Sequence, residues 1–275
     1  DDGFAIVEAI NAPDIDLIGI TCVYGNAPHP QVFRVANEIV ELKKVNVPVV
    51  AGAQIALPEH GDPGPSNDAV EFIAASLRTA PATIAAIGPL TTLGLLAWHY
   101  PDLLKQVQSL IVVAGRSKDR VFYIGGQGPV GDFNFENDPR SFDLTLNTSV
   151  PAVLAGFELT SQVCVTETDL DSIAANGNHA AIYFHRNSLD WCRYWTDTFP
   201  ADPGFHPWDS ATIAWIRHPE YFLTDQRRWH IDVPAKSKPQ LICEPVSDGS
   251  GITYVHGFAP GGKEAFINDV VTTVY

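Results

Sequence analysis

The sequence lacks methionine, long apolar runs and any excess of basic residues. The absence of methionine and the start at Asp1 predict that methionines are missing from the printed sequence and that a short N-terminal segment precedes Asp1 in the intact protein. Apolar runs stay below the roughly 20 residues of a membrane-spanning helix, and the start has neither region of a signal peptide. These absences predict a soluble, cytoplasmic protein.

Basic residues are too few to balance the acidic ones, with 17 Lys and Arg against 32 Asp and Glu and a net charge of −15. Such a surface repels phosphate backbones and anionic lipid headgroups, so we expect neither nucleic acid nor a membrane as a partner. Converging carboxylates can instead hold a divalent metal ion. The four cysteines are scattered without a Cys-x-x-Cys pair, which argues against a disulfide scaffold or a zinc site.

Short apolar runs alternate with stretches of helical periodicity along the first half of the chain, and this alternation is typical of βαβ units. It predicts the α/β class, with a doubly wound, mostly parallel central sheet covered by helices on both faces. Nothing resembles a linker, so we expect a single domain over residues 1–275. The segments that carry this prediction are 4–10, 16–21, 30–43, 47–51, 71–77, 84–87, 92–98 and 110–113.

Polar residues that follow the strands are the first candidates for a site, because ligands bind beyond the carboxyl ends of the strands in such sheets. Asn26, His60 and Thr91 occupy these places. Acidic residues also stand before helical runs, at Asp1 and Asp2 and again at Asp209. Taken singly, each of these acids is explained by helix capping.

Taken together and in order, these segments resemble the inosine-uridine-preferring nucleoside hydrolase family over nearly the whole chain. The matching pieces are Asp1-Asp2, Val23-Tyr24-Gly25-Asn26, His60-Gly61, Gly88-Pro89-Leu90-Thr91-Thr92, Asp132-Phe133-Asn134, Asp138-Pro139, and Trp208-Asp209 through His218-Pro219-Glu220. The resemblance implies an enzyme that hydrolyses the N-glycosidic bond of a small ribonucleoside, and a homodimer or homotetramer.

A calcium ion at the base of the active site is part of what the resemblance implies. Its ligands would be the carboxylates of Asp2 and Asp209 and the backbone carbonyl of Thr91, and hard oxygen donors of this kind suit Ca²⁺. The ion would hold the ribose diol and lower the pKa of the attacking water. The general base would be an Asp a few residues upstream of Asp1.

Around this ion, the resemblance assigns residues to the sugar and to catalysis. Asp1, Asn26, Asp132 and Asn134 would bind ribose hydroxyls, and His60 is a further candidate for substrate contact. Breaking the glycosidic bond builds positive charge on the ribose, which surrounding acceptors stabilise in the transition state. Asp1 and Asp2 are therefore assigned to the catalytic group.

Trp208 stands where many family members have a histidine beside the leaving base. Purine-preferring members also have Trp there, and an indole can stack on a purine and favour its protonation, so Trp208 joins the predicted catalytic and substrate-binding residues and purines are the predicted substrates. Trp195 lies on an aromatic stripe that is explained either by packing or by stacking on the base. His206 is a weaker candidate for polar contact.

Departures from the family pattern leave alternatives open. Asp132 replaces the usual Glu, which shortens the reach to the sugar by one methylene, and the first Asp of the family motif is not in the sequence. A catalytically silent nucleoside- or ribose-binding protein of the same fold is the main alternative. A different metal-dependent hydrolase would show His-x-x-x-His or a Gly-x-x-x-x-Gly-Lys loop, and neither occurs.

Overall fold

The computed structural model describes residues 1–235 and 238–274, and its centre is a seven-stranded sheet. The strand order is β3-β4-β6-β11-β9-β10-β5, and β1-β2 and β7-β8 form two further ladders. The strands are β1 Ile20–Cys22, β2 Val49–Ala51, β3 Ala82–Ala86, β4 Val107–Val113, β5 Arg116–Ser117, β6 Ala152–Ala155, β7 Val165–Thr166, β8 Gly204–Phe205, β9 Phe222–Asp232, β10 Gln240–Pro245 and β11 Ile252–Phe258.

Parallel pairing holds β3, β4, β6 and β11 together, as the alternation of strands and helices predicts. Strand β9 runs antiparallel to both β11 and β10, so the sheet is mixed at this end. The first predicted strand, at 16–21, is shorter than expected and shifted to Ile20–Cys22. The pairing begins where the Ile20 amide donates to the Pro48 carbonyl at 2.9 Å, and Pro48 itself has no amide proton to donate.

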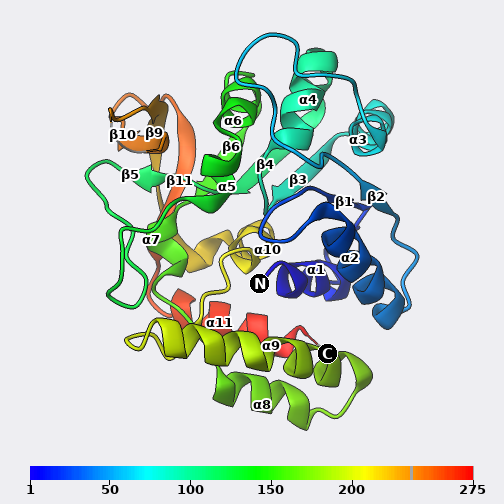
Figure 1. Cartoon of the computed structure of the whole chain (residues 1–275), viewed down its shortest axis with the longest axis vertical. Helices are drawn as coiled ribbons and strands as arrows, with labels where there is room; N and C mark the ends of the chain where they lie inside the picture. The colour runs from blue at the N-terminus through cyan, green and yellow to red at the C-terminus, as the bar shows by residue number, and fades with distance from the viewer. Residues whose placement is uncertain (236–237, 275) are drawn as a thin grey trace.

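Helices cover both faces of this sheet, which confirms the predicted fold class (Figure 1). The helices are α1 Asp2–Asn11, α2 His29–Lys43, α3 Asp68–Thr79, α4 Thr91–His99, α5 Phe133–Asn137, α6 Pro139–Leu146, α7 Phe157–Thr160, α8 Glu167–Ala175, α9 His179–Thr198, α10 Ser210–Arg217 and α11 Gly262–Thr272, with short 3₁₀ turns at Pro101–Gln106 and Pro219–Tyr221. No described helix is long and apolar enough to cross a bilayer.

Successive residues of β4 supply the two cores, because side chains alternate between the faces of a strand. Leu110 and Val112 pack into the cluster that contains residues of α3, α4 and α6. Ile111 packs into the opposite cluster, with residues of α1, α9 and α11. This two-sided burial explains the apolar run at residues 110–113 of β4.

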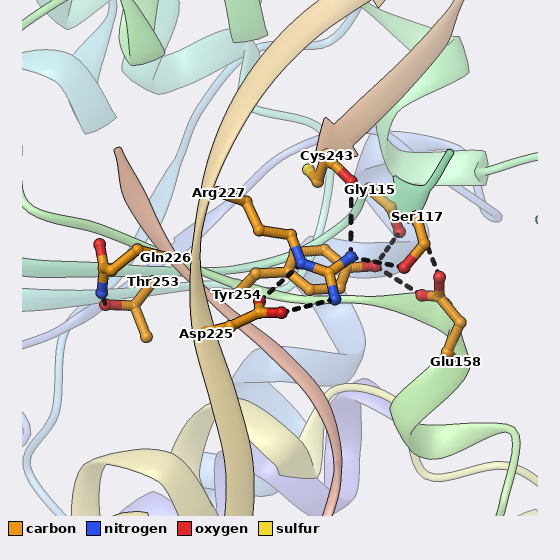
Figure 2. Close-up of polar contacts among 9 residues, drawn as sticks. All are labelled: Gly115, Ser117, Glu158, Asp225, Gln226, Arg227, Cys243, Thr253 and Tyr254. Carbon is orange, nitrogen blue, oxygen red and sulfur yellow. Dashed lines mark hydrogen bonds and ion pairs between the residues drawn. The ribbon is translucent and has the colours of Figure 1, made fainter. Parts of the chain in front are cut away.

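A buried polar network fastens β9 to the loop that follows β4 (Figure 2). The Arg227 guanidinium donates to both carboxylate oxygens of Asp225, at 2.6 and 3.1 Å, and to Ser117 Oγ at 2.5 Å. It also lies 4.0 Å over the Tyr254 ring, whose hydroxyl donates to Glu158 at 2.5 Å. Because every charged member has an opposite charge or a donor beside it, the network links β9, β10 and β11 to Ser117 of β5 and Glu158 of α7.

Candidate active site

Three aspartates that are far apart in the sequence meet at the start of α1 and α10. Ligand oxygens of Asp1, Asp2 and Asp209 all lie within 4.8 Å of one another. Asp1 precedes α1, Asp2 is its first residue, and Asp209 precedes α10, whose packing against α1 brings the cluster together. In Figure 1 the N-terminus accordingly lies beside α10.

The carboxylates of this cluster are not used as helix caps. Asp1 and Asp209 occupy the N-cap positions of α1 and α10, yet neither side chain accepts a capping hydrogen bond from the described backbone. Asp209 is only 5% exposed. Burial raises the pKa of Asp209 well above its usual range, and the nearby Asp2 carboxylate adds to the shift. Asp1 is partly buried and Asp2 is exposed, so the cluster joins one buried carboxylate to two that solvent can reach. Such a group of mutually repelling oxygens is chemically suited to a divalent cation.

Thr91 is fixed by a buried aspartate. Its hydroxyl donates to Asp138 Oδ2 at 2.7 Å, and the same oxygen accepts the Leu57 amide at 3.1 Å. The other oxygen of Asp138 caps α6 by accepting the Ser141 amide at 3.0 Å. These contacts involve the side chain of Thr91. The role of its backbone carbonyl as a metal ligand stays a prediction. The sequence singled out Asp138 only as part of a motif.

Asp132 and Asn134 lie at the carboxyl edge of the sheet, where the sugar is predicted to bind. Asp132 accepts the Gly115 amide at 2.7 Å and caps α5 through the Phe135 amide at 3.3 Å. Burial raises the pKa of Asp132 to about 6. The amide of Asn134 donates to the Val113 carbonyl at 3.0 Å, at the end of β4. Both side chains are therefore oriented by the backbone of the strand ends.

The predicted residues of the base pocket form an aromatic cluster directly before Asp209. The Trp208 ring lies 5.5 Å from Trp195 in an edge-to-face arrangement and 5.1 Å from His206. The indole nitrogens of both tryptophans are buried and have no hydrogen-bond partner among the described residues. His206, by contrast, has partners at both ring nitrogens: the Val163 carbonyl at 2.6 Å and Asp202 at 3.1 Å.

Asn26 and His60 are exposed residues on loops. The loop before Asn26 lies beside α5, because the Tyr24 hydroxyl donates to the Asn137 carbonyl at 3.1 Å. The loop around His60 is held by Arg140, whose guanidinium donates to the carbonyls on either side of it. In the part of the chain that the structure describes, no hydrogen bond or ion pair links either residue to the three aspartates.

A buried acid in α1 was missed by the sequence analysis. Glu8 is 4% exposed and accepts a hydrogen bond from Ser210 Oγ at 2.7 Å. Burial raises the pKa of Glu8 to about 8. The available signal was a lone acid inside the apolar run Phe4–Ile10, but its partner lies 202 residues away.

Comparison with known proteins identifies the family. The model of the inosine-uridine preferring nucleoside hydrolases matches residues 1–259. The pyrimidine-specific ribonucleoside hydrolase RihA of Salmonella typhimurium is 27% identical over 260 residues, which are 86% of this chain and 82% of that protein.

Solved structures agree on the fold. A purine-preferring ribonucleoside hydrolase from Gardnerella vaginalis superposes with a TM-score of 0.85 at 20% identity, covering 99% of this chain and 94% of that one. A plant nucleoside hydrolase superposes with a TM-score of 0.84, also at 20% identity, covering 99% and 95%. The resemblance seen in the sequence is confirmed, and this chain belongs to the inosine-uridine preferring nucleoside hydrolase family, whose members are hydrolases that act on N-glycosyl bonds.

Proposed function

We propose that this protein hydrolyses the N-glycosidic bond of ribonucleosides, prefers purine bases, and holds a calcium ion at Asp2, Asp209 and Thr91, beside Asp1. The observation that carries the proposal is the convergence of three carboxylates within 4.8 Å, one of them 95% buried. Because these carboxylates do not cap their helices, their oxygens remain available to a ligand.

Calcium fits this donor set because the cluster offers only hard oxygen atoms. The proposed ligands are Asp2, Asp209 and the carbonyl of Thr91, a residue that Asp138 holds in place. When bound, the ion supplies electrostatic activation of water and an anchor for the ribose diol.

The sugar is proposed to lie between Asp1 and the strand ends that carry Asp132 and Asn134, with Asn26 closing over it. Two backbone amides occupy two acceptor sites of Asp132, and a carboxylate has about four lone-pair sites, so acceptors remain for ribose hydroxyls. Anionic and carbonyl oxygens around the ribose stabilise the positive charge that develops as the base departs.

The base is proposed to stack against Trp208, with Trp195 behind it and the exposed His60 at the rim. The position of Trp208 supports this placement, because the residue is only partly buried and directly precedes Asp209. A two-ring base also gains more stacking area, and an aromatic contact contributes about 1 kcal/mol beyond burial. The relatives include both pyrimidine-specific and purine-preferring proteins, so base preference must be measured directly.

The test compares kcat/KM for inosine, guanosine, uridine and cytidine in the wild type and in Trp208→Ala. We expect faster cleavage of purines, and a larger loss for purines in the variant. Faster uridine cleavage by the wild type contradicts the purine preference, and an equal loss for all bases shows that Trp208 only packs. Nucleoside binding without turnover favours the alternative, a silent binding protein.

The cellular location is proposed from the thiols. Cys22, Cys192 and Cys243 are buried, and all four cysteines are free. Free thiols of this kind are typical of a reducing compartment, which supports the cytoplasm as the place of the reaction.

A further inference from the structure

A buried hydrogen bond joins α1 and α10, the two helices that carry the carboxylate cluster. Ser210 Oγ donates to Glu8 Oε1 at 2.7 Å. Glu8 is 4% exposed and Ser210 is fully buried. Because an unpaired polar group is costly in such surroundings, this bond strongly favours one placement of its two partners.

The bond lies next to the cluster on α10 and about two turns away from it on α1. Ser210 directly follows Asp209. Glu8 shares a helix face with Asp1, since the two are seven residues apart. Helical side chains lean toward the N-terminus, so the Glu8 carboxyl reaches back along α1 toward Asp1. Any change in this bond is therefore transmitted to the spacing of the aspartates.

Away from the aspartates, and from an exposed ion pair between Arg217 of α10 and Asp14 just after α1, the contact between the helices is apolar and less directional. Ala5, Ala9 and Ile213 form a small buried cluster between α1 and α10. The two alanines allow the helices to approach closely, but apolar packing alone tolerates small slides because it has no preferred direction. A hydrogen bond with a defined length and angle removes that freedom.

We propose that the Glu8–Ser210 hydrogen bond sets the register of α10 against α1, so that Asp209 meets Asp1 and Asp2 at the spacing a divalent cation requires. Glu8 and Ser210 are positioning residues and touch neither metal nor substrate. Their role is to hold like charges together against their mutual repulsion. This inference rests on the calcium site proposed above, and it adds two residues that act on that site.

The test measures calcium binding by titration calorimetry, and the calcium-induced rise in Tm, in the intact protein and three variants. Ser210→Ala removes one oxygen atom, and Glu8→Leu removes the acceptor. We expect both to weaken calcium binding by about 10- to 100-fold, the usual range for groups that orient metal ligands. Glu8→Gln keeps an acceptor oxygen, so it should lose less than about threefold. At saturating calcium, KM for the nucleoside should be unchanged in all three.

Asn11→Ala is the matched control, because Asn11 ties the other end of α1 through a hydrogen bond to the Thr273 carbonyl at 2.5 Å. It should lower Tm equally with and without calcium. If Ser210→Ala behaves in the same way, or if Glu8→Gln loses as much affinity as Glu8→Leu, the positioning role is wrong. A wild-type protein that binds no calcium overturns the calcium site itself and, with it, this inference.

Discussion

Two groups of aspartates begin helices in this protein, and they use their carboxylates differently. Asp132 and Asp138 precede α5 and α6 and accept backbone amides of those helices. Asp1 and Asp209 precede α1 and α10 and accept none from the described backbone. Both groups include buried residues, so burial alone does not separate them.

A position at a helix start therefore does not by itself assign a role to an acidic residue. A carboxylate whose oxygens accept backbone amides is satisfied by the fold and stabilises it. A buried carboxylate without such donors, next to others of the same charge, raises the free energy of the folded protein until a cation arrives. Substitutions in the first group should therefore lower the free energy of unfolding, whereas substitutions in the second group should lower activity.

The largest effect is expected for Asp209→Asn, which keeps the shape of the side chain and removes its charge. Loss of a metal ligand should lower kcat/KM for inosine on the order of 10³-fold. Urea unfolding of the metal-free variant should show unchanged or higher stability, because a buried repulsion is relieved. A variant that unfolds readily but keeps its turnover would place Asp209 in the structural group.

A smaller effect is expected on sugar recognition, where Asp132 tests the boundary between the groups. A site that pairs a substrate hydroxyl rejects the analogue without it, so inosine should be cleaved on the order of 10²-fold faster than 2′-deoxyinosine. Asp132→Asn, which keeps one capping oxygen, should reduce that ratio severalfold. An unchanged ratio would mean that Asp132 is only a cap.

In the capping group, Asp138→Ala should cost about 3 kcal/mol of unfolding free energy, because it removes one cap and leaves buried donors unpaired. Asp138 is 1% exposed and accepts bonds from three residues. Asp143→Asn on the exposed side of the same helix is the control and should change stability by less than about 0.5 kcal/mol. Equal stabilities of the two variants would remove the distinction between the groups.

Glu8 should make the stability of the protein depend on pH. Its pKa rises from 4.5 to about 8 on folding, so between these values the folded protein holds a proton that the unfolded chain releases. Wild-type stability from this group is complete below pH 4.5 and is lost as the pH rises toward 8. Relative to wild type, Glu8→Gln should gain roughly 1.4 kcal/mol per pH unit in that window, measured by urea unfolding. A constant difference across the window would contradict a buried neutral Glu8.

Parts of the fold could be predicted because their signals are local. The run Leu110–Val113 is apolar throughout and is buried on both faces, so it was recognisable as an inner strand. Strand β9, Phe222–Asp232, was not predicted, because its many charged residues hide the pattern of a strand. Its charges are accommodated by partners such as Asp225 beside Arg227, which only the folded sheet brings into place.

Some residues of the site could likewise be predicted from the sequence, and others could not. The order of short motifs was enough to select Asp1, Asp2 and Asp209, and the structure brings them together. Trp195 and Trp208 were also selected and are found in contact. Glu8 and Ser210 could not be paired from the sequence, because nothing local links residues that lie 202 positions apart.

The proposed calcium site at Asp2, Asp209 and Thr91 should be required for hydrolysis. The most direct measurement is kcat/KM for inosine with the intact protein, first after complete removal of divalent ions and then during calcium titration. We expect activity to fall to background when divalent ions are removed. Calcium should then restore activity in the wild type and should not restore it in Asp209→Asn. Full activity in the presence of excess chelator would contradict it.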